Sequence, residues 1–182
     1  MVQNKNNKIL IHACCGICSG YPIGLLKEMG YNPVVYFCNP NLDTKEEFER
    51  RLNAQKIICE YHNVELIVED YDHSLFLNTV AGLENEPERG ARCDKCIELR
   101  LEQAAKKANE LGISKFTTSL VISPHKNYEQ ISTIGLNNKY GVEYLPINFR
   151  KKDGFLKTNN LSRELNLYRQ NYCGCEFGKN KN

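Results

Sequence analysis

The chain has 182 residues, of which 41% are hydrophobic and 25% are charged. This length and composition predict one folded domain with a single core, and they exclude a chain too polar to fold. The first residues are polar, and the apolar run after them is too short for a signal sequence or a membrane span. We therefore expect a cytoplasmic protein with no membrane partner.

The formal charge of +2 is unevenly distributed along the chain. From residue 148 onward there are 8 Lys and Arg against 3 Asp and Glu, whereas the preceding residues carry 16 against 19. A basic C-terminal segment is typical of a protein that binds a polyanion. A solvated tail is the alternative explanation.

The first predicted element is a buried strand at residues 9–11, a short β-branched and leucine run. A helix is predicted over residues 21–29, with Pro22 in its first turn. In an open α/β sheet, ligands bind at the carboxyl ends of the strands. The loop between this strand and helix is therefore a candidate reactive centre, and it carries Cys14, Cys15 and Cys18.

Strands and helices are predicted to alternate along the rest of the chain. Strands are expected at residues 33–37, 64–68, 116–122 and 142–145, and helices at 45–61 (with Thr44 as N-cap), 75–80, 97–111, 128–137 and 161–168. This alternation predicts a mostly parallel sheet with helices on both faces. We expect one α/β domain over residues 1–182, with a flexible loop at about 70–92 and a C-terminal segment at 148–182.

The chain contains 9 cysteines, an unusual number for a protein of a reducing compartment, where they more often bind metal or do redox chemistry. Cys38 and Cys59 are expected to be small buried hydrophobic residues. The other seven form three tight groups: Cys14-Cys15-x-x-Cys18, Cys93-x-x-Cys96 and Cys173-Gly174-Cys175.

Three kinds of chemistry compete for these seven thiols. Two CxxC pairs can hold a zinc ion, and four thiolates can hold an iron–sulfur cluster. Adjacent cysteines suit a cluster better, because they can reach different corners of it. The Cys-Gly-Cys sequence can close a small, strained disulfide, and such disulfides tend to be labile or catalytic. We favour a cluster beside a redox-active pair, with zinc and pure thiol chemistry as the alternatives.

Several motifs resemble those of a known family. They are His12-x-Cys14-Cys15-x-x-Cys18-Ser19, Asn39-Pro40-Asn41, Gly90-x-Arg92-Cys93-x-x-Cys96, Ser123-Pro124-His125-Lys126-Asn127 and the final block from Leu167 to Cys175. These blocks cover nearly the whole chain in order and resemble the QueH family, the cobalamin-independent epoxyqueuosine reductases. The chain departs from the family pattern at Ile17, where proline is usual.

The resemblance implies a HUP-like, Rossmann-like three-layer fold. It also implies an oxidoreductase that removes the epoxide oxygen of epoxyqueuosine at the wobble position of tRNA, giving queuosine. Two electrons would come from an external donor. The related tRNA-thiolating enzymes carry an SGGxDS-type phosphate loop where this chain has residues 13–18, so ATP chemistry is not expected. A zinc-stabilised RNA-binding domain and an ATP-dependent tRNA sulfurtransferase relative are the alternative functions.

The site residues are assigned by hypothesis. A 4Fe-4S cluster is expected on Cys14, Cys15, Cys93 and Cys96, and Cys173 and Cys175 are expected to be the redox-active catalytic pair. Cys18 is an alternative metal ligand, in an arrangement with one additional iron or zinc ion. Contacts with tRNA are expected from His125, Lys126, Arg150, Lys151, Lys152 and Arg169.

Some residues have two interpretations that the sequence leaves open. His12 is either a hydrogen-bonded core residue or part of the site. Tyr168 and Tyr172 either stack on anticodon bases or pack in the core. Asp43 and Asp94 are both candidates for the proton source.

Overall fold

The structure is a computed structural model that describes residues 7–179. Five strands form one sheet in the order β3-β2-β1-β4-β5, and every neighbouring pair is parallel, as predicted. The strands are β1 (Lys8–His12), β2 (Asn32–Phe37), β3 (Glu65–Val68), β4 (Lys115–Thr118) and β5 (Glu143–Tyr144).

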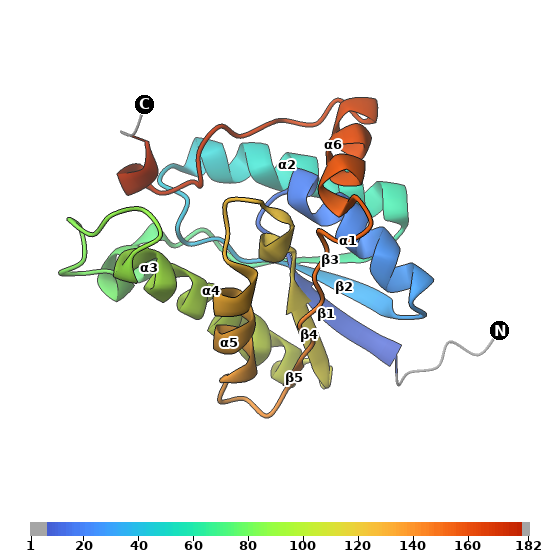
Figure 1. Ribbon diagram of the computed structural model, residues 1–182, viewed down its shortest axis with the longest axis horizontal. Coiled ribbons are helices and arrows are strands. Elements are labelled where there is room, and N and C mark those ends of the chain that lie inside the picture. Colours follow the sequence, from blue (N-terminus) through green and yellow to red (C-terminus); the bar gives the residue numbers. More distant parts are fainter. Residues whose placement is uncertain (1–6, 180–182) are drawn as a thin grey trace.

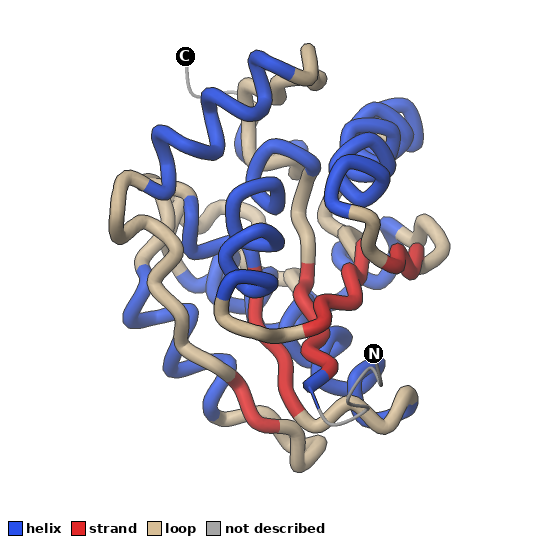
Figure 2. The backbone as a smooth tube through the Cα atoms, turned by 90° about the vertical axis from the view of Figure 1, so that its right-hand side faces the viewer, coloured by secondary structure: helices blue, strands red, loops and turns tan. Residues whose placement is uncertain are grey.

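Helices cover both faces of the sheet, which gives the three layers that the sequence predicts. In Figure 1, α1, α2 and α6 lie above the sheet, and α4 and α5 lie below it; Figure 2 shows the strands between the helices from the side. The helices are α1 (Gly16–Glu28), α2 (Lys45–His62), α3 (His73–Thr79), α4 (Ala91–Glu110), α5 (Tyr128–Leu136) and α6 (Gly154–Glu164), with short 3₁₀ helices η2 (Ser119–Ile122) and η3 (Glu176–Gly178).

The central strand is buried on both faces. Ile9, Leu10 and Ile11 are 0% exposed, as expected for the middle strand of a parallel sheet. On one face, α1 and α2 approach closely at Gly16, where a β-carbon would lie 2.4 Å from the Ala54 carbonyl oxygen. Only glycine fits this crossing, which sets the start of α1 against the middle of α2.

Two helices begin earlier than predicted, and this moves three cysteines from loops into helices. Helix α1 begins at Gly16, with Cys15 as its N-cap, so Cys18 lies in the first turn. Helix α4 begins at Ala91, so Cys93 and Cys96 lie in its first two turns. The predictions were wrong because the caps are cysteine and glycine, whereas Ser, Thr, Asp and Asn are the usual sequence signal of a helix start.

Two other boundaries differ from the prediction. The fourth strand ends at Thr118 and continues as η2 rather than as strand. The last helix, α6, begins at Gly154 and ends at Glu164, several residues before the predicted 161–168. Gly154 is packed so tightly that a β-carbon there would lie 1.7 Å from the Phe149 carbonyl oxygen. This contact fixes the start of α6 against the preceding loop.

The expectations for Thr44, Cys38 and Cys59 are confirmed, whereas the flexibility of residues 70–92 stays a prediction. Thr44 caps α2, because its hydroxyl accepts the N–H of Glu47. Cys38 and Cys59 are each 4% exposed and pack in the core. Residues 70–92 contain α3 and a series of turns; the Arg92 side chain ties these turns to α4 by donating to the carbonyl oxygens of Leu83, Glu84 and Glu86.

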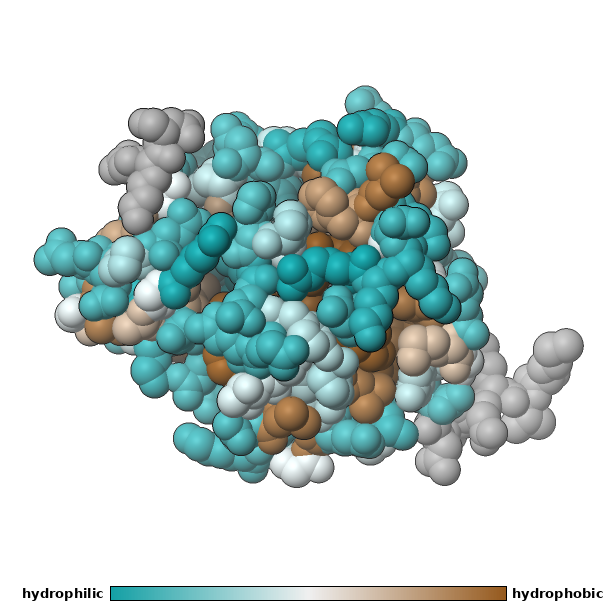
Figure 3. Space-filling model, viewed as in Figure 1, coloured by the Kyte–Doolittle hydropathy of each residue, from teal (hydrophilic) through white to brown (hydrophobic). Residues whose placement is uncertain are grey.

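None of the helices from residue 7 to 179 combines the length and the apolar character needed to cross a bilayer. The face seen in Figure 3 is mostly hydrophilic, with hydrophobic side chains showing in separate small areas.

Candidate active site

The first group of thiols lies at the carboxyl end of β1, around the start of α1. The sulfur atoms of Cys14, Cys15 and Cys18 all lie within 4.8 Å of one another. Cys15 Sγ also accepts the Cys18 N–H at 3.4 Å, which caps the helix. The local fold therefore gathers three soft donor atoms at one point.

These three thiols do not have equal acidity. Hydrogen bonds from Cys15 and Cys18 lower the pKa of Cys14 well below its usual range. The hydrogen bond with Cys14, together with burial, raises the pKa of Cys15 to about 12, and hydrogen bonds with Cys14 and Cys15 raise the pKa of Cys18. Cys14 is thus the thiol of this group that ionises most readily. A thiolate is the form of cysteine that binds soft metal ions.

The second group of thiols lines a small pocket between α4 and the C-terminal segment. Cys93 and Cys96 come from α4, and Cys173 and Cys175 come from the other side. Among residues 7–179, the pocket is also lined by three cationic residues and by no carboxylate; the cations are Arg92, Arg100 and Lys126. Burial raises the pKa of Cys96. The structure therefore places four thiols in an electropositive cavity.

Cys173 and Cys175 form a close dithiol. Their sulfur atoms are 3.5 Å apart, and all nine cysteines of the chain are free thiols in this structure. The hydrogen bond from Cys175 lowers the pKa of Cys173 to about 5, and it raises the pKa of Cys175 far above the ordinary value. Cys173 is thus the more acidic thiol of the two, and Cys175 keeps its proton more readily. The redox-active disulfide itself stays a prediction.

A buried ion pair on α2 holds the segment that carries this dithiol. Arg51 Nη2 and Nη1 donate to the carbonyl oxygens of Tyr172 and Cys173, both at 3.1 Å. Arg51 Nε donates to Glu47 Oε1 at 2.7 Å, and both side chains are almost fully buried. Figure 1 shows the C-terminal segment, in red, passing beside the N-terminal end of α2. The dithiol is therefore docked on α2.

Hydrogen bonds connect the two groups of thiols. Gln170, which precedes the dithiol, donates from Nε2 to Cys15 Sγ at 2.8 Å. From α4, Arg100 Nη2 donates to Asn39 Oδ1 at 2.6 Å, and Asn39 Nδ2 donates to the Ala13 carbonyl oxygen at 2.9 Å. The three segments that carry the thiols thus converge on one region of the sheet edge.

The four predicted cluster ligands are divided between the two groups. Cys14 and Cys15 lie in the first group together with Cys18. Cys93 and Cys96 lie in the pocket with the dithiol. Among residues 7–179, the first group is the one set of three or more candidate ligands whose atoms are all within 4.8 Å of one another. The joint ligand set therefore stays a prediction.

His12 is a structural residue. It is 0% exposed, its Nδ1 contacts the Thr118 hydroxyl at 2.9 Å, and its Nε2 contacts the Cys38 carbonyl oxygen at 3.1 Å. A carbonyl only accepts, so Nε2 carries the proton and Nδ1 accepts from Thr118. Burial, aided by the charge of Arg100, lowers the pKa of His12 to about 3. The imidazole is therefore neutral and joins the ends of three strands.

The two candidate proton sources are both engaged in hydrogen bonds. Asp43 accepts from the Tyr172 hydroxyl at 2.8 Å and pairs with Lys179 at 2.6 Å. Burial opposes its ionisation, but these partners outweigh burial and lower the pKa of Asp43. Asp94 accepts a hydrogen bond from the Gln130 amide. Neither carboxyl group lines the thiol pocket.

Of the six residues predicted to contact tRNA, three line the pocket or donate hydrogen bonds within the protein, and three are exposed. Lys126 lines the thiol pocket, and Arg150 supports it by donating to the Lys126 carbonyl oxygen at 3.1 Å. Arg169 donates to Ser162 and Asn159 of α6. The other three side chains are exposed: His125, Lys151 and Lys152. The two lysines lie just before α6, and because they are exposed they are accessible to a large ligand.

The two tyrosines have structural hydrogen bonds in addition to any contact with a ligand. The Tyr168 hydroxyl donates to Glu47 Oε2 at 2.7 Å, and the Tyr172 hydroxyl donates to Asp43. Both rings are partly buried. Core packing is thus confirmed for part of each side chain.

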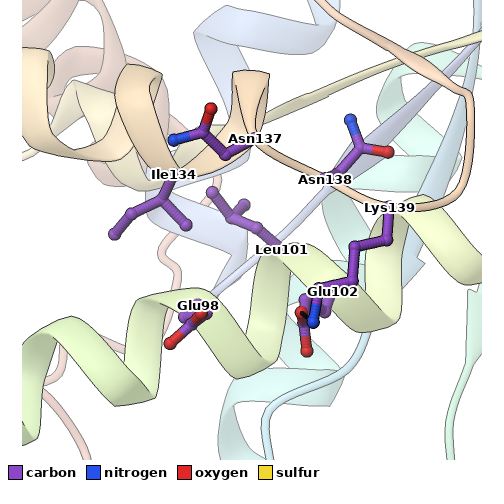
Figure 4. Close-up of a pocket in the computed structure, with 7 residues that line it drawn as sticks. All are labelled: Glu98, Leu101, Glu102, Ile134, Asn137, Asn138 and Lys139. Atoms are coloured by element: carbon purple, nitrogen blue, oxygen red, sulfur yellow. Dashed lines mark ion pairs between the residues drawn. The ribbon is translucent and has the colours of Figure 1, made fainter.

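A separate hollow of about 120 Å³ lies between α4 and α5. Figure 4 shows Lys139 beside Glu102 there, and their charged atoms are 3.8 Å apart. Its lining has no cysteine or histidine. It therefore offers carboxylates but no thiol or imidazole.

The sequence interpretation missed the polar residues that hold the thiols in place: Asn39, Glu47, Arg51, Arg100 and Gln170. Arg100 could have been found from spacing alone. It follows Cys96 by four residues, so the two side chains share one face of α4. Glu47 and Arg51 have the same spacing on α2. Their burial depends on the C-terminal segment, and no local pattern shows that contact.

The fold and the site define a Rossmann-like α/β protein with a thiol-rich centre at the carboxyl edge of its parallel sheet. The family model "Epoxyqueuosine reductase QueH" matches residues 9–181, and the chain belongs to this family. The chain is 38% identical to the Epoxyqueuosine reductase QueH of Streptococcus pyogenes serotype M1, an alignment that covers 96% of this chain and 71% of that protein. It is 33% identical to the QueH protein of Thermotoga maritima, over 93% of this chain and 88% of that protein.

Solved structures agree on the fold. The U34-tRNA thiolase NcsA from Methanococcus maripaludis, solved with its 4Fe-4S cluster, superposes with a TM-score of 0.61 at 16% identity. The match covers 97% of this chain and 63% of that chain. A predicted tRNA methyltransferase subunit from Methanocaldococcus jannaschii has a TM-score of 0.57, over 84% of this chain and 74% of that one, at 15% identity. The HUP-like fold class is thereby confirmed.

Proposed function

We propose that this protein is an epoxyqueuosine reductase, which removes the epoxide oxygen of epoxyqueuosine in tRNA to give queuosine. Family membership over residues 9–181 supports the reaction. The observation that carries the chemistry is the pocket that joins Cys93 and Cys96 of α4 to the Cys173–Cys175 dithiol. Such a site can store and deliver electrons.

The donor set fits an iron–sulfur cluster as the cofactor. The candidate ligands are Cys14, Cys15, Cys93 and Cys96, and thiolate sulfur is the usual ligand of a 4Fe-4S cluster. The absence of carboxylates from the pocket and its three cations also suit a centre of net negative charge. When bound, the cluster would supply single electrons from an external donor. NcsA, which has a similar fold, holds a 4Fe-4S cluster.

Oxidation of the dithiol supplies the two electrons that the reaction consumes. Removing an epoxide oxygen as water, with formation of the alkene, consumes two electrons and two protons. Oxidation of the Cys173–Cys175 dithiol to a disulfide releases two electrons and two protons, and its sulfur atoms are already 3.5 Å apart. Because Cys173 is the thiolate, the pair itself delivers two electrons and the proton of Cys175, and the second proton comes from solvent. An external electron donor would then reduce the disulfide for the next turnover.

The first experiment tests the cofactor. The full chain is reconstituted anaerobically with iron and sulfide, and its metal content, absorption and EPR spectra are measured. We expect iron and sulfide in equal amounts and visible absorption that dithionite bleaches. Zinc without iron would contradict the cluster and favour the zinc-stabilised alternative. Metal in excess of the cluster would support a second ion near Cys18.

The second experiment tests the dithiol. Cys173→Ser and Cys175→Ser are assayed for conversion of epoxyqueuosine in tRNA, with Cys59→Ala as a control from the core of α2. We expect both Ser variants to take up iron normally and to lose conversion, and the control to retain it. A Cys173→Ser variant that turns over at the wild-type rate would contradict the role of the pair.

A further inference from the structure

Arg100 is a buried cation between the two groups of thiols. It lies on α4, one turn after Cys96, and it lines the thiol pocket. The residue is 4% exposed, so it cannot be an ordinary surface charge. A buried cation between the two groups of thiols needs a nearby negative charge.

The protein provides little direct compensation for this charge. Arg100 Nη2 donates to the neutral amide oxygen of Asn39, and the buried Nε has no hydrogen-bond partner. Within residues 7–179, the ion pairs formed by carboxylates do not include Arg100. A buried charge without a counter-charge is strongly unfavourable. An anion in the adjoining site would stabilise this charge.

The other two buried arginines, on α2 and α4, have more partners than Arg100 has. Arg51 is paired with Glu47 at 2.7 Å. Arg92, which lines the same pocket, donates to three backbone carbonyl oxygens and lies over the Phe177 ring. Arg92 also has a buried Nε without a partner among the described residues, but its three carbonyl acceptors and the aromatic ring offset its burial. Arg100 has one neutral partner and lines the pocket that holds four of the thiols.

The groups that can supply the missing charge are the thiolates on both sides. The charge of Arg100 favours the thiolate forms of Cys14 and Cys96, which belong to different groups. Through Asn39, Arg100 also holds the Ala13 carbonyl oxygen, directly before Cys14. Arg100 thus acts on both halves of the proposed ligand set, through its charge and through its hydrogen bond to Asn39. A phosphate of a large RNA is a poorer partner, because the guanidinium is buried.

We propose that Arg100 is the counter-charge of a metal–thiolate centre formed between the two thiol groups, and that it sets the electron affinity of this centre. The inference rests on the proposed function. The reduction potential of an iron–sulfur centre depends on the charge and hydrogen bonds around it. A fixed positive charge stabilises the reduced form, which carries one more electron. Arg100 is a positioning residue as well, because it links α4 to the loop before Cys14.

The test measures the midpoint potential of the reconstituted full-length protein by anaerobic dithionite titration, followed by absorption. Arg100→Met removes the charge, and Arg100→Lys keeps it while removing the planar fork. Lys106→Met is the control, because it makes the same change in charge at an exposed position of the same helix. We expect at least a tenfold loss of electron affinity in Arg100→Met, which is 59 mV for a one-electron couple. The midpoint potential of Arg100→Lys should stay closer to that of wild type. The potential of Lys106→Met should equal that of wild type.

Each result has one meaning. If wild-type protein takes up iron and the potential of Arg100→Met is unchanged, the counter-charge role is wrong and the proposed function stands. If wild-type protein takes up no iron, the proposed cofactor is wrong, and this inference fails with it. If Arg100→Met does not fold, the neutral Arg100→Gln takes its place, and its potential is compared with wild type together with the thermal stabilisation that iron gives each protein. A counter-charge predicts a higher potential and a larger stabilisation in wild type than in the neutral variant. Equal potentials and equal stabilisation in wild type and the neutral variant would overturn the inference.

Discussion

Among single residues, Cys173 and Cys175 differ most in chemistry although they have the same side chain. The hydrogen bond across 3.5 Å gives the thiolate to Cys173 and the proton to Cys175. An attacking thiol must be ionised, so this division decides which sulfur reacts first. It also gives the site a property that can be measured without substrate.

The pH dependence of alkylation tests this division. In reduced, metal-free protein, Cys173 should react with iodoacetamide with a midpoint near its lowered pKa of about 5, so its rate rises through that pH and is level at neutral pH. Cys175→Ala removes the hydrogen-bond donor, so the midpoint should move up towards about 8.5, the value of a free cysteine. Peptide mapping by mass spectrometry separates Cys173 from Cys14. A midpoint that is the same in both proteins would show that Cys175 is not the cause.

Gly174 is the one residue between these thiols, and it is required for two reasons. Its φ of +118° is strained for other residues, and a β-carbon would lie 2.4 Å from Leu42 Cδ2. We expect Gly174→Ala to lower the free energy of unfolding by roughly 1–3 kcal/mol more than Gly82→Ala. Gly82 is a matched control, since its φ is +84° and nothing lies within 4 Å. Urea unfolding measures both, and equal losses would mean that the contact with Leu42 is easily relieved.

At the scale of elements, α2 acts as the platform for the C-terminal segment. Its buried Glu47–Arg51 pair is spaced by one helical turn and holds two backbone carbonyl groups of that segment. Removing one partner of a buried ion pair leaves the other charge unpaired. The stability of the platform and the position of the dithiol are therefore coupled.

Variants of neighbouring arginines test this coupling. Arg51→Met should lower the free energy of unfolding by about 3–5 kcal/mol, because Glu47 stays buried without its partner. Arg50→Met is the control. Arg50 contacts the same carboxylate at 3.9 Å, but its side chain is 62% exposed, so the loss should be about 0–1 kcal/mol. Urea unfolding gives both values, and similar losses would show that burial of the Arg51 pair contributes little.

The elements of the sheet could be predicted from sequence because they depend on local patterns. The apolar runs of β1 and β2 and the amphipathic pattern of α4 are visible in the chain itself. The starts of α1 and α4 could not be predicted in the same way. Their N-caps, Cys15 and Gly90, also have other common roles. The order of elements was therefore predictable, but the helical position of three thiols was not.

The site was predictable only in part. The grouping of seven cysteines is visible in the sequence, and so is the proximity of Cys14 and Cys15. The joining of α4 to the C-terminal segment was inferred from family motifs, because contacts between residues so far apart leave no local signal. The buried Arg100 and Arg51 were not expected, because arginine is usually exposed.

For the whole molecule, the charge distribution makes a prediction about tRNA. Lys151 and Lys152 are exposed at the start of the basic C-terminal segment, on the loop that also supports Lys126 of the pocket. If both contact phosphates of a single-stranded region, replacing both with Gln should reduce the salt dependence of binding, log Kd against log salt, by roughly 1 to 2 units. The matched control replaces Lys56 and Lys106, which are exposed elsewhere. Filter binding at several salt concentrations measures the slopes, and identical slopes would exclude these two contacts.

The docking of the C-terminal segment has a consequence for how the protein is made. Synthesis runs from the N-terminus, and nascent domains generally begin to fold in that order. The strands, α1 and α4 therefore leave the ribosome before Cys173 and Cys175 do, and during that interval the first five clustered thiols are not yet covered by the dithiol segment. The later arrival of Cys173 and Cys175 then completes the thiol pocket, so this pocket is the last part of the site to form.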